Sequence, residues 1–185
     1  MQTRFSLLLI ALLCDGCVGV MPRQDHSPVA LANALRALSP TVNAAEARHA
    51  AECAYTTSIR LRRDYRIVGP AIFQNGLVNL GLREKGLCYH WTEDLLPEMR
   101  RLDLKTLKIH WAVSHPGDFL ESNALVLTAR GQPFVDGIVL DAWRHAGDLY
   151  WNTVTADRAF DWHDDHSDFA RRRMIETLPA SSRSP

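Results

Sequence analysis

The sequence predicts an α+β domain in which helices from the first half of the chain pack on an antiparallel sheet formed by the second half. Apolar residues recur at helical spacing up to Leu102, and short alternating or apolar runs separated by turn residues follow from Leu104 onward. The chain has 185 residues, of which 46% are hydrophobic, and this content suits one compact domain with tails.

The helical half begins with short segments and ends in a longer amphipathic one. Asn43 and Glu46 fit a capping box at the start of an alanine-rich helix. The apolar segment Ile72–Leu82 is interrupted by glycine, and we expect it to lead across the core into the next helix. The expected helices are Val29–Leu38, Asn43–Arg62 and Cys88–Leu102, the last with Pro97 as a point of kinking.

The second half has the pattern of a β-meander. Four segments of strand character follow one another with short links, which favours antiparallel pairing of neighbours. The expected strands are Leu104–Val113, Asn123–Arg130, Gly137–Trp143 and Leu149–Val154. A helix is expected over Ser167–Leu178. Because the helices precede the sheet, the pattern indicates an α+β domain.

The amino terminus has the features of a bacterial secretion signal. Arg4 is followed by the apolar run Phe5–Leu13, which is too short to span a bilayer, and then by Asp15-Gly16-Cys17. This resembles a lipobox, with cleavage after Gly16 and lipid attached to Cys17; an ordinary signal peptide cut nearby is the alternative. The expected organisation is a signal at 1–17, a tether at 18–41, a single domain at 42–178 and a disordered tail at 179–185. The predicted location is the bacterial cell envelope, with the domain lipid-anchored and facing the periplasm.

Charge and cysteine content narrow the classes of partner. The formal net charge is zero, so a nucleic-acid partner, which needs a concentrated positive field, is not expected. If Cys17 carries lipid, the domain keeps Cys53 and Cys88. In an oxidising compartment these two could pair, or one could be structural and the other functional, and both alternatives stay open.

The segment Gly86–Asp94 (GLCYHWTED) places Cys88 on the first turn of a helix. Unpaired backbone N–H groups and the helix dipole favour the thiolate at such a position, which is one way to make a sulfur nucleophile. The alternative is a small apolar side chain buried under the helix.

Two segments resemble transglutaminase-like and papain-like cysteine enzymes. They are Gly86-Leu87-Cys88-Tyr89-His90-Trp91 and Val139-Leu140-Asp141-Ala142-Trp143. The chain also resembles a group of proteobacterial lipoproteins of uncharacterised activity that share a GLCYxW segment and a GQPF…LDxWRH segment. The resemblance implies a transglutaminase-like core in which Cys88 is the nucleophile and Asp141 orients a histidine on a neighbouring strand.

The position at which that resemblance implies the histidine is occupied by Ser122, at the start of the second expected strand. Serine is not a base at neutral pH, so either another histidine substitutes or the site is inactive. His115 is the best substitute because it lies across the expected hairpin loop. His110 is expected on the opposite face of its strand from Trp111, and His90 is too close to Cys88 along the same helix to face it.

Three functions follow as hypotheses. The first is a thiol hydrolase or acyl-transferase acting on an amide bond in the cell envelope, with Cys88 as nucleophile, Asp141 as orienting acid and His115 as the candidate base. The second is a catalytically degenerate protein that binds an envelope protein or peptide, and the third is a purely structural Cys88. The membrane is expected as a partner through lipid on Cys17, and no cofactor is expected. The acid–histidine cluster is more simply a polar loop than a metal site; it comprises Asp161, His163, Asp164, Asp165, His166 and Asp168.

Overall fold

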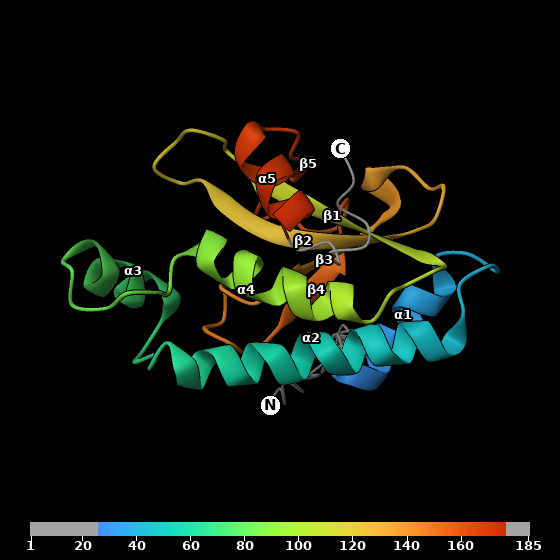
Figure 1. Ribbon diagram of the computed structural model, residues 1–185, viewed down its shortest axis with the longest axis horizontal. Coiled ribbons are helices and arrows are strands. Elements are labelled where there is room, and N and C mark those ends of the chain that lie inside the picture. The colour runs from blue at the N-terminus through green and yellow to red at the C-terminus, as the bar shows by residue number, and fades with distance from the viewer. Residues whose placement is uncertain (1–25, 177–185) are drawn as a thin grey trace, which may run out of the picture.

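The computed structural model describes residues 26–176, which form an α+β domain (Figure 1). This confirms the predicted α+β class. The helices are α1 (Pro28–Ala37), α2 (Ala44–Asp64), α3 (Ala71–Asn79), α4 (Cys88–Arg101) and α5 (Asp168–Glu176). The predicted signal, the lipidation site Cys17 and the predicted tail at 179–185 lie outside the described residues.

The sheet has five strands in the order β4-β3-β2-β1-β5, and every pairing is antiparallel. The strands are β1 (Leu107–Ser114), β2 (Ser122–Ala129), β3 (Ile138–Asp141), β4 (Tyr150–Thr153) and β5 (His163–Asp164), and a 3-10 turn, η1 (Phe134–Asp136), precedes β3. The predicted four-strand meander is therefore present. The edge strand β5 was not predicted, because its two residues lie within the acid–histidine segment and carry no strand pattern.

Helix α1 belongs to the domain although the sequence prediction placed its residues in the tether. Ser27 caps the helix by accepting a hydrogen bond from the Ala30 N–H at 3.1 Å. Leu31 and Leu35 are fully buried against the large core that α1 shares with α2. The folded unit therefore begins before residue 42.

Helix α3 differs most from the prediction. We expected Ile72–Leu82 to cross the core, but the chain forms a short helix at one end of the molecule (Figure 1). Only Ala71 and Gln74 of this helix are buried. An apolar run without clear alternation fits either a buried or a surface element, and the tertiary contacts decide which one forms.

The two faces of the sheet are covered differently, and this determines where the site residues point. The odd-numbered residues of β2, such as Leu125 and Leu127, face the large core beneath α1, α2, α4 and α5. The even-numbered residues, such as Ala124 and Val126, face a smaller cluster that contains Trp162. Because side chains alternate along a strand, each position of β2 can be assigned to one face.

Candidate functional site

The start of α4 is fixed by close contacts with the preceding loop. His90 accepts hydrogen bonds from the backbone N–H groups of Gly86 and Leu87 through Nδ1, both at 3.2 Å, so the ring serves as a side-chain cap. Gly86 has φ of +142°, and a Cβ there would lie 2.5 Å from Cγ of Gln74. The glycine is therefore required both by backbone conformation and by this close approach.

Cys88 is the first residue of α4, as predicted, and its half-buried sulfur points to the start of β2. The Sγ atom lies 3.5 Å from the carbonyl oxygen of Glu121 and 3.8 Å from Nδ2 of Asn123. Burial raises the pKa of the Cys88 thiol, and the charge of Asp141 adds to the rise, while hydrogen bonds from Asn123 oppose it. The neutral thiol is therefore the favoured form, which is the opposite of what a sulfur nucleophile requires.

Asn123, which the sequence did not single out, donates a side-chain hydrogen bond to the Cys88 sulfur. Its Oδ1 accepts a hydrogen bond from Nε1 of Trp111 at 2.7 Å, and its Nδ2 donates to Oε1 of Glu121 at 3.1 Å. The amide is thus held by both of its ends. An amide cannot accept the thiol proton at neutral pH, so Asn123 does not replace a catalytic base.

Ser122 lies between the two residues that contact Cys88. Alternation along β2 places its side chain on the sheet face of Ala124 and Val126, which is also the face of Asp141 on β3. Ser122 is buried, and its hydroxyl has no hydrogen-bond partner among the described residues. Cys88, Ser122 and Asp141 therefore lie at the same end of the sheet, but Ser122 and Asp141 point to the face opposite the one on which α4 packs and Asn123 contacts the Cys88 sulfur. The expected histidine position at Ser122 therefore does not face Cys88, because alternation along β2 gives that direction to Asn123.

Asp141 is fully buried, and its carboxylate is engaged by Arg144. It accepts hydrogen bonds from Nε of Arg144 at 2.9 Å and from the backbone N–H groups of Trp143 and Arg144 at 3.0 and 2.9 Å. Arg144 also forms a bidentate pair with Asp157, at 3.0 and 2.6 Å. Burial raises the pKa of Asp141, and the Arg144 charge opposes that rise.

The side chains of Arg144 and Asp157 therefore complete a buried ion-pair network that the sequence analysis missed. The Arg144 guanidinium also lies 3.9 Å from the ring centroid of Tyr150, and Trp162 Nε1 donates to Asp157 at 2.9 Å. Burial opposes ionisation of Asp157, but hydrogen bonds from Arg144 and Trp162 lower its pKa. The three-residue spacing from Asp141 to Arg144 was the available signal, since it suits a turn that returns the arginine to the acid.

None of the candidate histidines is hydrogen-bonded to Cys88 or Asp141. His115 sits in the β1–β2 loop with φ of +52°, and its Nδ1 lies 2.9 Å from Oγ of the neighbouring Ser114. His110 is buried on the face opposite Trp111, as predicted, between Asp164 at 2.9 Å and Thr128 at 3.1 Å. His90 uses its Nδ1 to cap α4. Burial lowers the pKa of His90, which favours the neutral ring.

The other sequence candidates do not form sites within residues 26–176. Cys53 and Cys88 are both free thiols, so the alternative of a disulfide between them is not realised. No group of three or more potential metal ligands converges in the described part of the chain. The acid–histidine segment instead provides β5 and the cap of α5, through a hydrogen bond from Ala170 N to Ser167 Oγ at 3.2 Å.

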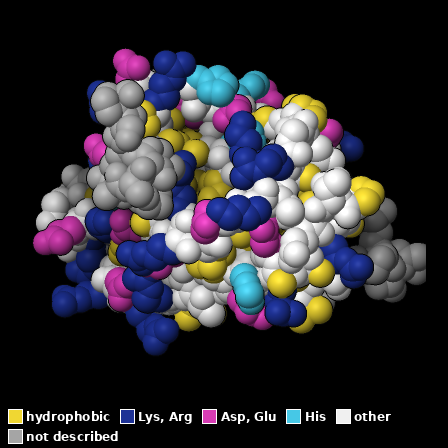
Figure 2. Space-filling model, turned by 45° about the vertical axis from the view of Figure 1, so that its right-hand side comes forward, with side chains coloured by type: hydrophobic (Ala, Val, Ile, Leu, Met, Phe, Trp, Pro, Cys, Tyr) yellow, Lys and Arg dark blue, Asp and Glu magenta, His cyan; other side chains and the backbone are white. Residues whose placement is uncertain are grey.

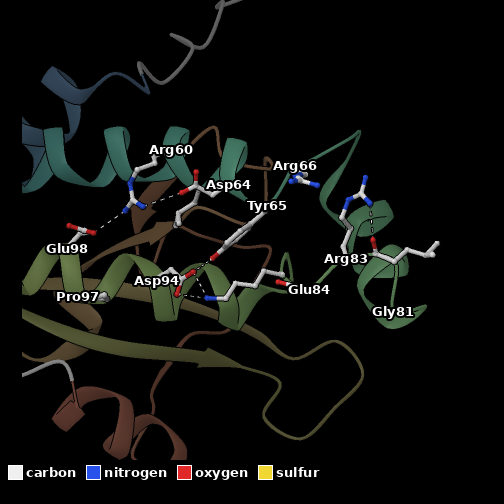
Figure 3. A pocket seen from close by; sticks show the side chains of 13 residues that line it. Arg60, Asp64, Tyr65, Arg66, Gly81, Arg83, Glu84, Asp94, Pro97 and Glu98 are labelled. Carbon is white, nitrogen blue, oxygen red and sulfur yellow. Dashed lines mark hydrogen bonds and ion pairs between the residues drawn. The ribbon is translucent and has the colours of Figure 1, made fainter.

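A hollow of about 710 Å³ lies between the end of α2, α4 and the loop after α3 (Figure 3). Its lining includes a partly exposed contact in which the Tyr65 hydroxyl donates to Asp94 at 2.7 Å and Lys85 Nζ lies 2.6 Å from the same oxygen. Burial and the hydrogen bond to Asp94 raise the pKa of Tyr65, so the phenol stays neutral. Arg66 and Arg83 lie on its rim.

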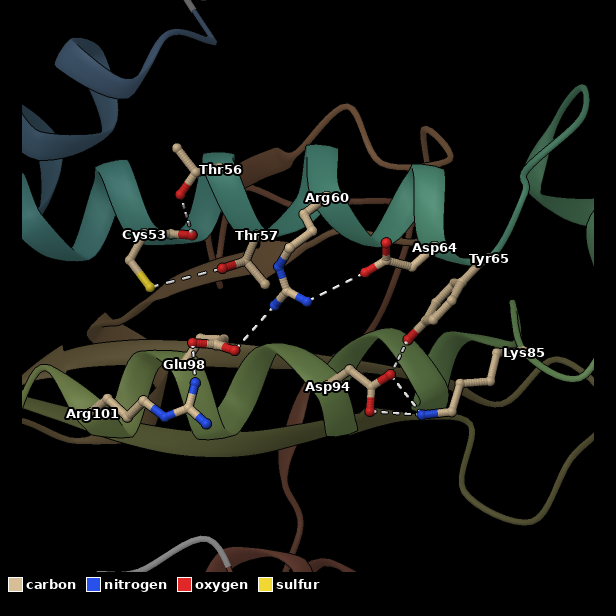
Figure 4. Close-up of polar contacts among 10 residues, drawn as sticks. All are labelled: Cys53, Thr56, Thr57, Arg60, Asp64, Tyr65, Lys85, Asp94, Glu98 and Arg101. Carbon is tan, nitrogen blue, oxygen red and sulfur yellow. Dashed lines mark hydrogen bonds and ion pairs between the residues drawn. The ribbon is translucent and has the colours of Figure 1, made fainter.

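Ion pairs close one wall of this hollow by joining α2 to α4 (Figure 4). Arg60 lies 3.1 Å from Glu98 and 3.3 Å from Asp64. Six residues separate Cys88 from Asp94 on α4, a rotation of about 240° around the helix axis. The hollow and the Cys88 site therefore lie on different sides of the same helix.

Charged side chains on the face shown in Figure 2 are interspersed, with Lys and Arg beside Asp and Glu rather than in one basic field. None of the helices within residues 26–176 has the length and apolar content needed to cross a bilayer. No protein-family model, curated protein or solved structure matches the chain.

Proposed function

We propose that this chain is a catalytically degenerate relative of the transglutaminase-like thiol enzymes that binds a protein or peptide of the bacterial cell envelope. The observation that carries the proposal is the surroundings of the Cys88 sulfur. Its polar neighbours are an amide and a carbonyl oxygen, and neither can accept its proton. The proposed envelope location and the lipid on Cys17 rest on residues 1–17 of the sequence.

The engagement of Asp141 supports the same proposal. In a thiol triad the acid accepts a hydrogen bond from the histidine and stabilises the imidazolium. Here one Asp141 oxygen accepts two backbone N–H groups and the other accepts Arg144 Nε. Asp141 therefore has a structural role in an ion-pair network.

The strand position that faces Cys88 supports the relationship to thiol enzymes. Alternation along β2 turns Asn123 toward α4 and Ser122 toward the opposite face of the sheet, where Asp141 also lies. The place beside the sulfur, where a thiol enzyme would hold its histidine, is therefore occupied by the Asn123 amide.

The alternative is an active thiol hydrolase or acyl-transferase, with Cys88 as nucleophile and a histidine that approaches only when substrate binds. The charge of Asp141 acts on the Cys88 thiol, so the two residues lie at the same end of the sheet, and this favours keeping the second candidate. In that case His115 is the side chain to move, since it lies in the adjoining hairpin loop.

The test is the pH dependence of Cys88 alkylation by iodoacetamide, followed cysteine by cysteine with peptide-resolved mass spectrometry. In the wild-type chain we expect Cys88 to react only at alkaline pH, above the ordinary thiol pKa of about 8.5. Cys53 is the internal control, because burial raises its pKa as well. Rapid alkylation of Cys88 at mildly acidic pH would contradict the proposal and favour the active enzyme.

Asn123→His supplies a base on the face of β2 that contacts Cys88, and Asn123→Ala controls for loss of the amide. We expect Asn123→His to accelerate Cys88 alkylation at neutral pH about ten-fold or more, through formation of a thiolate–imidazolium pair. Asn123→Ala should not show this acceleration. A folded Asn123→His variant that reacts no faster than Asn123→Ala would show that this is not a thiol-enzyme site lacking its base.

A further inference from the structure

Helix α3 turns a polar side chain toward the domain and apolar side chains toward solvent, the reverse of an ordinary surface helix. Its buried polar residue is Gln74, which is 0% exposed, whereas Ile72 and Phe73 are 67% and 55% exposed. A surface helix normally turns its apolar stripe toward the core. The outward apolar face of α3 is therefore a candidate contact surface for a partner outside the domain.

Hydrogen bonds fix α3 in this orientation. Nε2 of Gln74 donates to the carbonyl oxygens of Tyr65 and Lys85, both at 3.2 Å. On the next residue, Asn75 Oδ1 accepts a hydrogen bond from Trp143 Nε1 at 3.0 Å. Two consecutive amides thus attach the helix to the domain, and its rotation about its own axis is determined by those contacts.

The apolar surface continues beyond the helix on both sides. Leu80 and Leu82 are 74% and 59% exposed, and Val68 precedes the helix in an exposed turn. We call Val68, Ile72, Phe73, Leu80 and Leu82 the α3 patch. The patch sits on a helix at one end of the long axis of the molecule (Figure 1). The β1–β2 loop, with the exposed Phe119 and Leu120, lies at the same end.

Two arginines border the α3 patch along the chain. From Tyr65 to Arg83 the only charged residues are Arg66 and Arg83, and Asp64 and Glu84 lie directly outside this stretch. Neither arginine forms an ion pair within the described part of the chain, whereas Asp64 pairs with Arg60; Arg83 donates to the carbonyl oxygen of Leu82 at 2.9 Å. Apolar side chains beside cations without a carboxylate partner match the boundary between acyl chains and anionic headgroups.

We propose that the α3 patch docks onto an anionic lipid bilayer, with Ile72, Phe73 and Leu80 in the headgroup–acyl boundary and Arg66 and Arg83 at lipid phosphates. A protein partner is less favoured, because interfaces usually combine apolar contacts with about one hydrogen bond per 100–200 Å². The amides of Gln74 and Asn75 are turned inward and unavailable for such bonds. The inference does not depend on the reactivity of Cys88.

The predicted lipid anchor is compatible with this docking. Cys17 precedes His26, the first described residue, by nine positions, which limits their separation to about 30 Å in an extended chain. A domain tethered at that distance meets the bilayer repeatedly. Docking through α3 would then set which end of the domain faces the membrane.

The experiment places an environment-sensitive fluorophore on the full chain at Asn79→Cys, in a background with Cys14→Ser, Cys17→Ser, Cys53→Ala and Cys88→Ala, so that position 79 carries the one thiol. Asn79 is exposed and follows Ile72 by seven residues, so it shares the outward face without belonging to the patch. With vesicles of phosphatidylglycerol and phosphatidylcholine we expect a blue shift and quenching by spin-labelled lipid. With phosphatidylcholine alone we expect a clearly weaker effect. The control probe, at the exposed Val135→Cys in η1, should stay aqueous in both.

Substitutions then separate lipid docking from other causes. Ile72→Ser should reduce the docking equilibrium on the order of ten-fold through lost apolar burial. Arg83→Gln should reduce it about five-fold, on anionic vesicles only. Circular dichroism should show that the Ile72→Ser and Arg83→Gln variants are folded, because neither replaced side chain belongs to the core. A blue shift without vesicles that grows with protein concentration would overturn the proposal in favour of self-association, and an aqueous probe on anionic vesicles would also overturn it.

Discussion

Arg144 is hydrogen-bonded to the Asp141 carboxylate, the group that a thiol enzyme would use to orient its histidine. The guanidinium contacts Asp141 through Nε and Asp157 through both terminal nitrogens, and all three side chains are largely excluded from water. Its position is fixed by aromatic contacts, with the Tyr150 and Phe160 ring centroids at 3.9 and 4.6 Å. The network joins the end of β3 to the segment that follows β4, so it stabilises the sheet end where Cys88 lies.

Replacing Arg144 should therefore destabilise the fold strongly. In Arg144→Gln two buried carboxylates lose their counter-ion, and breaking a buried pair in this way costs about 3 kcal/mol or more. The measurement is urea unfolding followed by tryptophan fluorescence. Arg63→Gln is the matched control, because Arg63 is exposed and should change the unfolding free energy by less than about 0.5 kcal/mol. Equal midpoints for the two variants would contradict a structural role for the network.

At the residue scale, the sequence indicated the elements on which Cys88 and Asp141 lie but not what each side chain contacts. Cys88 and Asp141 could be placed because a helix start and a buried strand end have local patterns. The pairing of Asp141 with Arg144 depends on the direction of side chains in a turn, and the sequence pattern does not reveal that direction. The direction of the His115 side chain depends on the conformation of its loop, and its φ of +52° could not be predicted from the strand pattern.

At the scale of elements, the start of α2 shows how a local motif was redirected by tertiary contacts. Asn43 caps the helix as predicted, with Oδ1 accepting from the N–H groups of Ala45 and Glu46 at 2.8 and 3.2 Å. Glu46 does not close the predicted capping box. Its carboxylate accepts instead from the N–H groups of Lys105 and Thr106, both at 2.8 Å, and so joins α2 to the chain entering β1.

This contact should make stability depend on pH through Glu46. Partial burial opposes the shift, but hydrogen bonds from Thr106 and Lys105 lower the pKa of Glu46. A carboxyl whose pKa is lower in the folded state adds stability above its unfolded pKa, and that stability is lost as pH falls through the folded pKa. We expect Glu46→Gln to cost about 1 kcal/mol at neutral pH, and the difference from wild type to shrink progressively as pH falls below the unfolded pKa of about 4.3.

Urea unfolding of wild type and variant at several pH values measures this difference. Glu52→Gln on the same helix is the control, since its carboxylate is exposed and lies 4.0 Å from Arg48. It should change stability little at any pH. A pH-independent cost for Glu46→Gln would mean that the carboxylate charge does not matter at this contact.

Helix α3 shows the limit of pattern analysis at the same scale. The run from Ile72 to Leu82 has enough apolar residues to suggest burial, and the amides of Gln74 and Asn75 look like interruptions. Their carbonyl and indole partners come from Tyr65, Lys85 and Trp143, which are far away in the sequence or separated from them by turns. Only those contacts reveal that the polar side faces inward.

For the whole molecule, the packing divides the chain into a rigid centre and a lightly attached end. Strand β2 is the middle strand of the sheet, and all eight of its residues are buried. Helix α4 packs on it, and α2 packs on α4, so these elements share one core. In contrast, α3 buries two residues and has no extensive contact with another helix or strand.

Native-state hydrogen exchange should separate these two parts. Amides of β2 and α4 should exchange only through global unfolding, whereas α3 should open locally, because little apolar surface resists its detachment. We expect α3 amides to exchange on the order of a hundred-fold faster than those of β2. Low concentrations of urea should accelerate hydrogen exchange of the β2 amides far more than that of the α3 amides, since local opening of α3 exposes little surface. If α3 and β2 exchange at the same rate and with the same urea dependence, α3 is part of the cooperative core, and its outward apolar face is held as rigidly as the sheet.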